Sequence, residues 1–182
     1  MIKKDLKEKR TPILIAMVLI LSIFIGIIGF VVGSDNIENY NHPYLFEIIV
    51  GGIGIALGIK TSLKLKPFIA VNQKLKTGYS IPVMFISAGF LGVFLLTGSL
   101  VNRKLSKVED SVKYTVIDKY MSRGTLHTPG IISLNVIING ESQRLNCSRR
   151  YWDNVYIGQS IKLCYHTSPL GFDYISLVGD EK

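Results

Sequence analysis

Three long apolar runs occupy the first hundred residues, and the pattern changes to strict alternation after them. The runs are Pro12–Val32, Pro43–Ile59 and Ile81–Val101. The first and third hold 21 residues each, enough for a helix to cross about 30 Å of hydrocarbon. A signal peptide would have a shorter apolar region, about 7–15 residues, and a small-residue cleavage site. The pattern therefore predicts an uncleaved membrane domain at 1–101, with spans at about 12–32 and 81–101.

The middle run is shorter and carries a charge. Pro43–Ile59 has 17 residues, or about 26 Å of helix. The Lys60 side chain can reach the interface along its aliphatic stem, which extends the span to about 44–63. Glu47 falls in the first helical turn, where a carboxylate can contact water and favours the positive helix N-terminus. The composition thus permits a third crossing.

The distribution of basic residues predicts the orientation of the chain across the membrane. Met1–Arg10 holds five basic and two acidic residues, Lys60–Lys76 holds five lysines and no acid, and Gly33–Tyr44 holds no Lys or Arg. Short loops rich in Lys and Arg stay in the cytoplasm. We therefore expect three crossings of the inner membrane, a cytoplasmic N-terminus and an extracytoplasmic C-terminal domain. Arg103, Lys104 and Lys107 oppose this assignment but are outnumbered.

Small residues recur at helical spacing inside the apolar runs. Gly54 and Gly58 are four residues apart, as are Gly29 and Gly33, and this spacing lets helix backbones approach closely in lipid. We expect these glycines at helix–helix contacts, either within the chain or between copies in a homo-oligomer. Glu47 is the membrane carboxylate candidate; a role at the helix start is favoured over one in a small transporter component.

The last 70 or so residues alternate apolar and polar positions, as half-buried strands do. Asn139-Gly140 is typical of a two-residue hairpin turn. On the strand before it, Leu134 and Val136 are expected to face inward and Ser133 outward. We predict an α+β membrane protein: a linker at 102–110, then a small five-stranded β-barrel of the OB or SH3-like kind at 111–182.

The last strands resemble a bacterial family of unknown function whose members join one to a few membrane spans to a small β domain. The family pattern is Val-Gly-Asp-x-Val-x-Val-x-Tyr, followed by a turn and a closing strand. The residues at its places here are Ile157, Gly158, Gln159, Ile161, Leu163 and Tyr165. Gln159 replaces the usual Asp. The resemblance implies a membrane-anchored small β-barrel and no activity.

The cysteines and histidines do not form the pattern of a disulfide or a metal site. Strand parity places Cys147 on the inward face and Cys164 on the other, so we expect two thiols and no disulfide. Cys164, His166 and His127 lack the spacing of metal ligands, so no metal or cofactor is expected. A membrane-bound hydrolase or redox protein using Cys164 and His166 is kept as the alternative function.

The segment Arg149–Trp152 combines Arg150, Tyr151 and Trp152 with Arg149, residue types enriched in binding hot spots. The net charge of +8 gathers beside the apolar runs, which indicates contact with the lipid bilayer and not with nucleic acid. We therefore expect a non-enzymatic membrane protein whose β-barrel binds or scaffolds another membrane or envelope protein through this segment. Headgroup contact and a plug of the barrel end by Trp152 are the alternatives.

Overall fold

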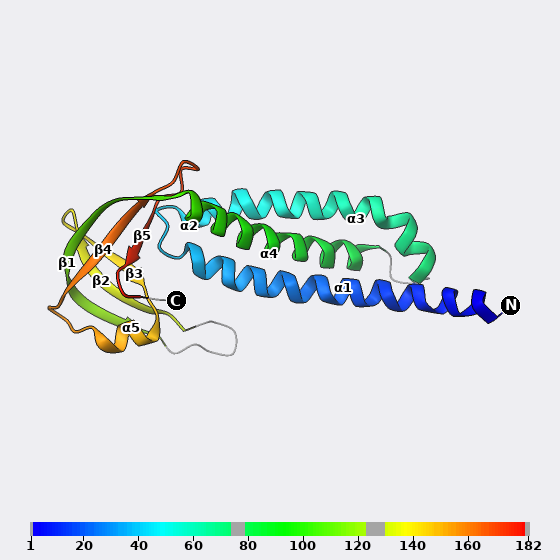
Figure 1. Cartoon of the computed structure of the whole chain (residues 1–182), viewed down its shortest axis with the longest axis horizontal. Helices are drawn as coiled ribbons and strands as arrows, with labels where there is room; N and C mark the ends of the chain where they lie inside the picture. The colour runs from blue at the N-terminus through cyan, green and yellow to red at the C-terminus, as the bar shows by residue number, and fades with distance from the viewer. Residues whose placement is uncertain (1, 74–78, 123–129, 181–182) are drawn as a thin grey trace. The chain divides into compact units, whose positions relative to one another are not determined.

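The computed structural model describes residues 2–73, 79–122 and 130–180 (Figure 1). The chain divides into two compact units, a helical unit of Met1–Asn36 with Tyr44–Val101 and a β unit of Ile37–Pro43 with Asn102–Lys182. The helices are α1 (Ile2–Ile37), α2 (Pro43–Phe46), α3 (Gly52–Gln73), α4 (Ser80–Leu105) and α5 (Arg149–Asn154). The strands are β1 (Lys107–Met121), β2 (Ile132–Ile138), β3 (Glu141–Asn146), β4 (Ser160–Thr167) and β5 (Tyr174–Leu177).

Within the residues that the structure describes, three stretches of helix are long and apolar enough to cross a membrane. They are Ile15–Ile37, Pro43–Ile69 and Ser80–Leu105, with 23, 27 and 26 residues. The expectation of three membrane-spanning helices by length and composition is therefore confirmed. Each stretch includes the span predicted from the sequence or overlaps it closely.

The middle helix continues well beyond the predicted end near residue 63. α2 leads directly into a π-helical segment, Glu47–Gly51, and then into α3, which ends at Gln73. Most of the basic stretch expected as a loop is therefore helical, because lysine is a good helix former whose long stem can lie along apolar surface. Pro67 lies inside α3, and the last part of α3 changes direction in Figure 1, as expected near a proline that removes a helical hydrogen bond.

Close contacts between glycines set α1 against α4. A Cβ atom built on Gly29 would lie 2.5 Å from the carbonyl oxygen of Gly92, and one on Gly33 would lie 3.0 Å from the Leu95 backbone. Later residues of α1 contact later residues of α4, so the two helices run parallel. Only residues without a side chain allow backbones to come this close.

α3 packs on α4 in the opposite direction. A Cβ atom on Gly54 would lie 2.9 Å from the Phe90 carbonyl oxygen, and one on Gly58 would lie 2.6 Å from the Ser87 Cα. Later residues of α3 thus meet earlier residues of α4. The four glycines singled out in the sequence all lie at contacts between helices of the same chain.

The β unit contains a five-stranded antiparallel sheet that curls into a half-barrel. Its strand order is β3-β2-β1-β4-β5, and β1 is the long strand that curves across it (Figure 1). The first part of β1 pairs with β4 and the last part with β2. The register shifts between Val116 and Asp118, and an extra residue of this kind bends a strand.

The core of the β unit follows the predicted alternation. Leu134, Val136 and Leu163 are fully buried on the inner face. The hairpin turn also forms as expected, with φ of 53° at Asn139 and 85° at Gly140. Ser133 differs from the prediction, because it is fully buried.

The predicted linker at 102–110 is replaced by regular structure. α4 ends at Leu105 and β1 begins at Lys107. Asn102 holds this junction, because its buried side-chain amide donates to the Phe172 carbonyl at 2.8 Å and accepts from the Ser168 hydroxyl at 2.6 Å. Two hydrogen bonds satisfy a polar group that would otherwise be costly to bury.

The segment Ile37–Pro43, expected only as an outer loop, bridges the two edges of the half-barrel. The Asn39 carbonyl accepts from the Ile175 amide of β5 at 3.1 Å. The Asn39 side chain both donates to and accepts from the backbone of Asn146 on β3, at 2.9 Å in each case. One residue of this segment thus links the edge strands that the sheet itself leaves unpaired in the described residues.

Candidate functional site

α5 is a short helix fixed at its start by Ser148. The Tyr151 amide donates to the Ser148 hydroxyl at 3.2 Å, as expected for serine at the N-cap. The Ser148 amide in turn donates to both carboxylate oxygens of Asp180 at 3.1 Å. The beginning of α5 is therefore tied to the chain that follows β5.

The end of α5 is held by Lys119 of β1. The Lys119 ammonium donates to the carbonyls of Trp152 and Val155 and lies 4.0 Å from the centroid of the Trp152 ring. The last carbonyls of a helix lack intrahelical partners, and a cation satisfies them well. Lys119 was not singled out in the sequence, because the contact depends on a β1 residue 33 positions away from Trp152.

We predict that Lys119→Met destabilises α5 by about 1–3 kcal/mol, because two carbonyls lose a charged donor. Thermal unfolding followed by fluorescence of Trp152, the one tryptophan of the chain, measures the change. Lys113→Met is the matched control, since Lys113 is an exposed residue of the same strand. Equal unfolding temperatures for the two variants would contradict the assignment.

The four residues of the predicted contact segment point in two directions. Arg149 forms an ion pair with Asp153 at 3.0 Å and lies 5.5 Å from the Trp152 ring. Trp152 packs against the core of the β unit, and its buried indole N–H has no hydrogen-bond partner within the described part of the chain. Tyr151 packs against the same core and also lines a pocket, together with Arg150. Trp152 therefore supports the fold, while Arg150 is available to a ligand.

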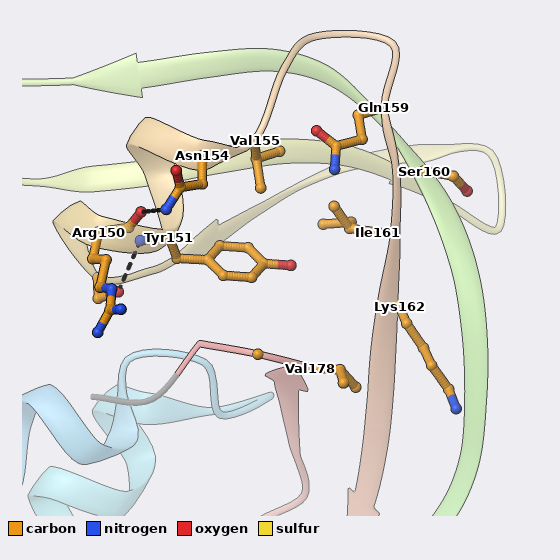
Figure 2. A pocket seen from close by; sticks show the side chains of 11 residues that line it. Arg150, Tyr151, Asn154, Val155, Gln159, Ser160, Ile161, Lys162 and Val178 are labelled. Atoms are coloured by element: carbon orange, nitrogen blue, oxygen red, sulfur yellow. Dashed lines mark hydrogen bonds between the residues drawn. The ribbon is translucent and has the colours of Figure 1, made fainter.

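The pocket has a volume of about 510 Å³ and lies between α5, the first half of β4 and the turn after β5. Figure 2 shows the Tyr151 ring extending across it, with Arg150 and Lys162 on the two sides. Asn154 and Gln159 add polar groups to the lining. Burial raises the pKa of the Tyr151 phenol, and the Asp180 carboxylate raises it further, so Tyr151 keeps its proton at neutral pH.

The turn between α5 and β4 exposes two large side chains, and the residues on either side of them, Val155 and Gln159, line the pocket. Tyr156 and Ile157 are 71% and 62% exposed. Gly158 has a φ of 84°, which favours glycine. The Gln159 side-chain oxygen accepts from the Tyr156 amide at 2.9 Å, which directs the Gln159 NH2 group toward the pocket (Figure 2). No motif in the sequence signals this arrangement, since three separate segments form it.

Of the two residues of the alternative function, Cys164 and His166, the imidazole of His166 is engaged by the neighbouring strand β5. The His166 ring stacks on Tyr174 with centroids 4.3 Å apart and an interplanar angle of 6°. Its Nε2 atom forms a 2.8 Å hydrogen bond with the Ser176 hydroxyl. Cys164 lies on the same strand, half-buried, and Cys147 is buried in the core; both are thiols. His127 lies outside the described residues, and within them no group of three or more potential ligands is placed to hold a metal ion.

Burial lowers the pKa of the His166 imidazole, and the nearby Arg103 guanidinium lowers it further. The folded state therefore takes up a proton less readily than the unfolded chain, in which the pKa is about 6.5. The contribution of His166 to stability is complete above about pH 6.5 and is lost as the pH falls toward the folded-state pKa.

We therefore predict that the β unit unfolds at a lower temperature at pH 5 than at pH 7.5. His166→Gln should reduce this pH dependence, while His42→Gln, which changes an exposed histidine, should leave it intact. Thermal unfolding at the two pH values gives the comparison. A wild-type profile retained in His166→Gln would show that other groups cause the dependence.

Glu47 lies in the helical unit, as the first residue of the π-helical segment. One of its carboxylate oxygens accepts a 3.3 Å hydrogen bond from the Ser34 hydroxyl of α1. This hydrogen bond links the last part of α1 to the first part of the next helical stretch. The helical stretch begins at Pro43, so Glu47 lies one turn after its start, whereas the sequence predicted it in the first turn.

Together these features define an α+β protein in which helices able to span a membrane accompany a curled five-stranded sheet with a cationic pocket. Comparison of the chain with protein-family models, with curated proteins and with solved structures finds no match. The resemblance of the last strands to a bacterial family therefore rests on the turn glycine, Gly158, and on strand alternation alone.

Proposed function

We propose that this chain is a three-span inner-membrane protein whose β unit, on the extracytoplasmic side, binds another membrane or envelope protein without catalysing a reaction. The observation that carries the proposal is the turn after α5. There the exposed Tyr156 and Ile157 lie in the chain between Val155 and Gln159, two residues that line the same pocket as Arg150. Aromatic residues and arginine are enriched where proteins bind one another.

The proposed membrane topology is supported by the two chain segments that make up the β unit. Ile37–Pro43 and Asn102–Lys182 belong to one compact unit, so both belong on one side of a membrane. The parallel course of α1 and α4, with α3 antiparallel to them, agrees with three crossings. The lysines near the other ends of the helices favour the cytoplasm for that side.

We also propose that the half-barrel is of the OB-like kind. A helix, α5, separates β3 from β4, and the long β1 pairs with both β2 and β4. An OB-fold is a five-stranded, partly open barrel. Closure at the open seam is then provided by Asn39, which bonds to β3 and β5.

A binding experiment on the full-length chain tests the function. Affinity-tagged protein is cross-linked in membranes, solubilised and purified, and its copurified proteins are identified. Tyr156→Ala combined with Ile157→Ala should reduce the recovery of a specific partner by about tenfold or more, as expected for hot-spot residues. Ile137→Ala combined with Leu170→Ala is the control, since both side chains are 49% exposed elsewhere on the β unit.

Both double variants should keep the wild-type unfolding temperature. Equal recovery of the partner by the two variants would reject the turn as the contact surface. Absence of any specific partner of the wild-type chain would reject the proposed function.

A further inference from the structure

We infer that the pocket beside α5 binds carboxylate side chains of an acidic peptide segment, which the partner protein presents. This inference rests on the proposed function and names the chemistry of the partner. The ligand class is a segment in which Asp or Glu residues adjoin apolar ones. Arg150 and Lys162 hold the carboxylates, and the turn after α5 contacts the apolar neighbours.

The charge of the pocket is the first argument. Its two ionisable side chains besides Tyr151 are Arg150 and Lys162, and no carboxylate is among the residues that line it. Neither cation has an ion-pair partner within the described part of the chain. The Asp180 carboxylate accepts hydrogen bonds from the amide of Ser148, which lines the pocket. Two exposed cations in one hollow attract an anion more strongly than isolated surface charges do.

Hydrogen-bond donors facing the pocket are the second argument. Because the Gln159 oxygen is bonded to the Tyr156 amide, the Gln159 NH2 group remains to donate. The Tyr151 phenol keeps its proton, since its pKa is raised. Together with Arg150 and Lys162, these groups offer several donors to an acceptor-rich ligand. Charge-assisted hydrogen bonds to carboxylates are the strongest of this kind.

The size and edge of the pocket favour a peptide over a small free anion. A volume of about 510 Å³ exceeds what one carboxylate needs and lies in the range of sites that hold larger ligands. Val178 lines the pocket and is 48% exposed, and Ile157 on the adjacent turn is more exposed still. A peptide can use both the cationic interior and this apolar edge.

The test uses the full-length chain in detergent, with hexaglutamate as the acidic probe. Hexaglutamine is the uncharged probe, and inorganic phosphate represents a small anion. Trp152 fluorescence reports binding, since this one tryptophan lies on α5 next to Tyr151. The wild type should bind hexaglutamate saturably and hexaglutamine much more weakly.

Arg150→Ala combined with Lys162→Ala should weaken hexaglutamate binding by about tenfold or more. The matched control, Lys107→Ala with Arg144→Ala, removes the same charge from exposed positions outside the pocket and should bind nearly as the wild type does. Equal weakening in both double variants would show a general charge effect and overturn the inference. Phosphate binding without hexaglutamate binding would also overturn it.

The partner experiment separates this inference from the proposed function. If the wild-type chain recovers a partner that the Arg150→Ala and Lys162→Ala variant recovers equally well, the acidic-segment inference fails while the proposed function stands. If no partner is recovered although hexaglutamate binds at the pocket, the proposed function fails and the pocket's preference for carboxylates stands.

Discussion

Gly29→Ala is expected to destabilise the helical unit by about 1–3 kcal/mol, the cost of forcing extra volume into a packed interface. The new Cβ atom would lie 2.5 Å from the carbonyl oxygen and 2.6 Å from the carbonyl carbon of Gly92. Both are backbone atoms, so α1 and α4 must separate to accept the methyl group. Loss of helical circular dichroism on heating the purified protein measures the effect.

Gly52→Ala is the control for this change. A Cβ atom at Gly52 would meet nothing within 4 Å, and alanine is the better helix former. We expect an unchanged or slightly higher unfolding temperature. Equal unfolding temperatures for Gly29→Ala and Gly52→Ala would contradict the close packing of α1 against α4 at Gly29.

Asn39→Ala is expected to open the seam of the half-barrel. The substitution removes both hydrogen bonds to the Asn146 backbone, and each backbone group left unsatisfied costs about 1–3 kcal/mol. Hydrogen exchange at the amides of Asn146 and Ile175 should become faster, because the first loses its acceptor and the second depends on the position of Asn39.

Asn41→Ala provides the matched control for the seam. Asn41 bonds to β5 through its backbone amide, which donates to the Asp173 carbonyl at 2.9 Å, and its side chain is exposed. Its replacement should leave exchange at Asn146 and Ile175 slow. Equal exchange rates in the two variants would contradict a bridging role for the Asn39 side chain.

The sequence was sufficient to predict the features that depend on local pattern. Apolar runs predicted the three helices, alternation predicted the five strands, and Asn139-Gly140 predicted the hairpin between β2 and β3. The end of the middle helix was harder to predict. α3 continues through a lysine-rich stretch whose composition is equally suited to a loop. The close-packed glycines were visible because their spacing repeats every four residues.

The features that join distant segments could not be predicted in this way. Asn39 contacts Asn146 across 107 positions, and nothing in the polar segment around Asn39 distinguishes it from a solvated loop. From the sequence, Lys119 is expected to be an exposed strand residue. In the structure it follows the register shift in β1 and contacts the end of α5. The pocket likewise combines Arg150, Lys162 and Val178 from three elements.

The side of the membrane on which the β unit lies decides which partners it can meet. Single cysteines are introduced into a Cys147→Ala and Cys164→Ala background, at Leu170 in the β unit and at Gln73 at the end of α3. A membrane-impermeant maleimide is then added to spheroplasts. We predict labelling of Leu170→Cys in intact spheroplasts and of Gln73→Cys only after lysis. Protection of Leu170→Cys until lysis would place the β unit in the cytoplasm and contradict the account.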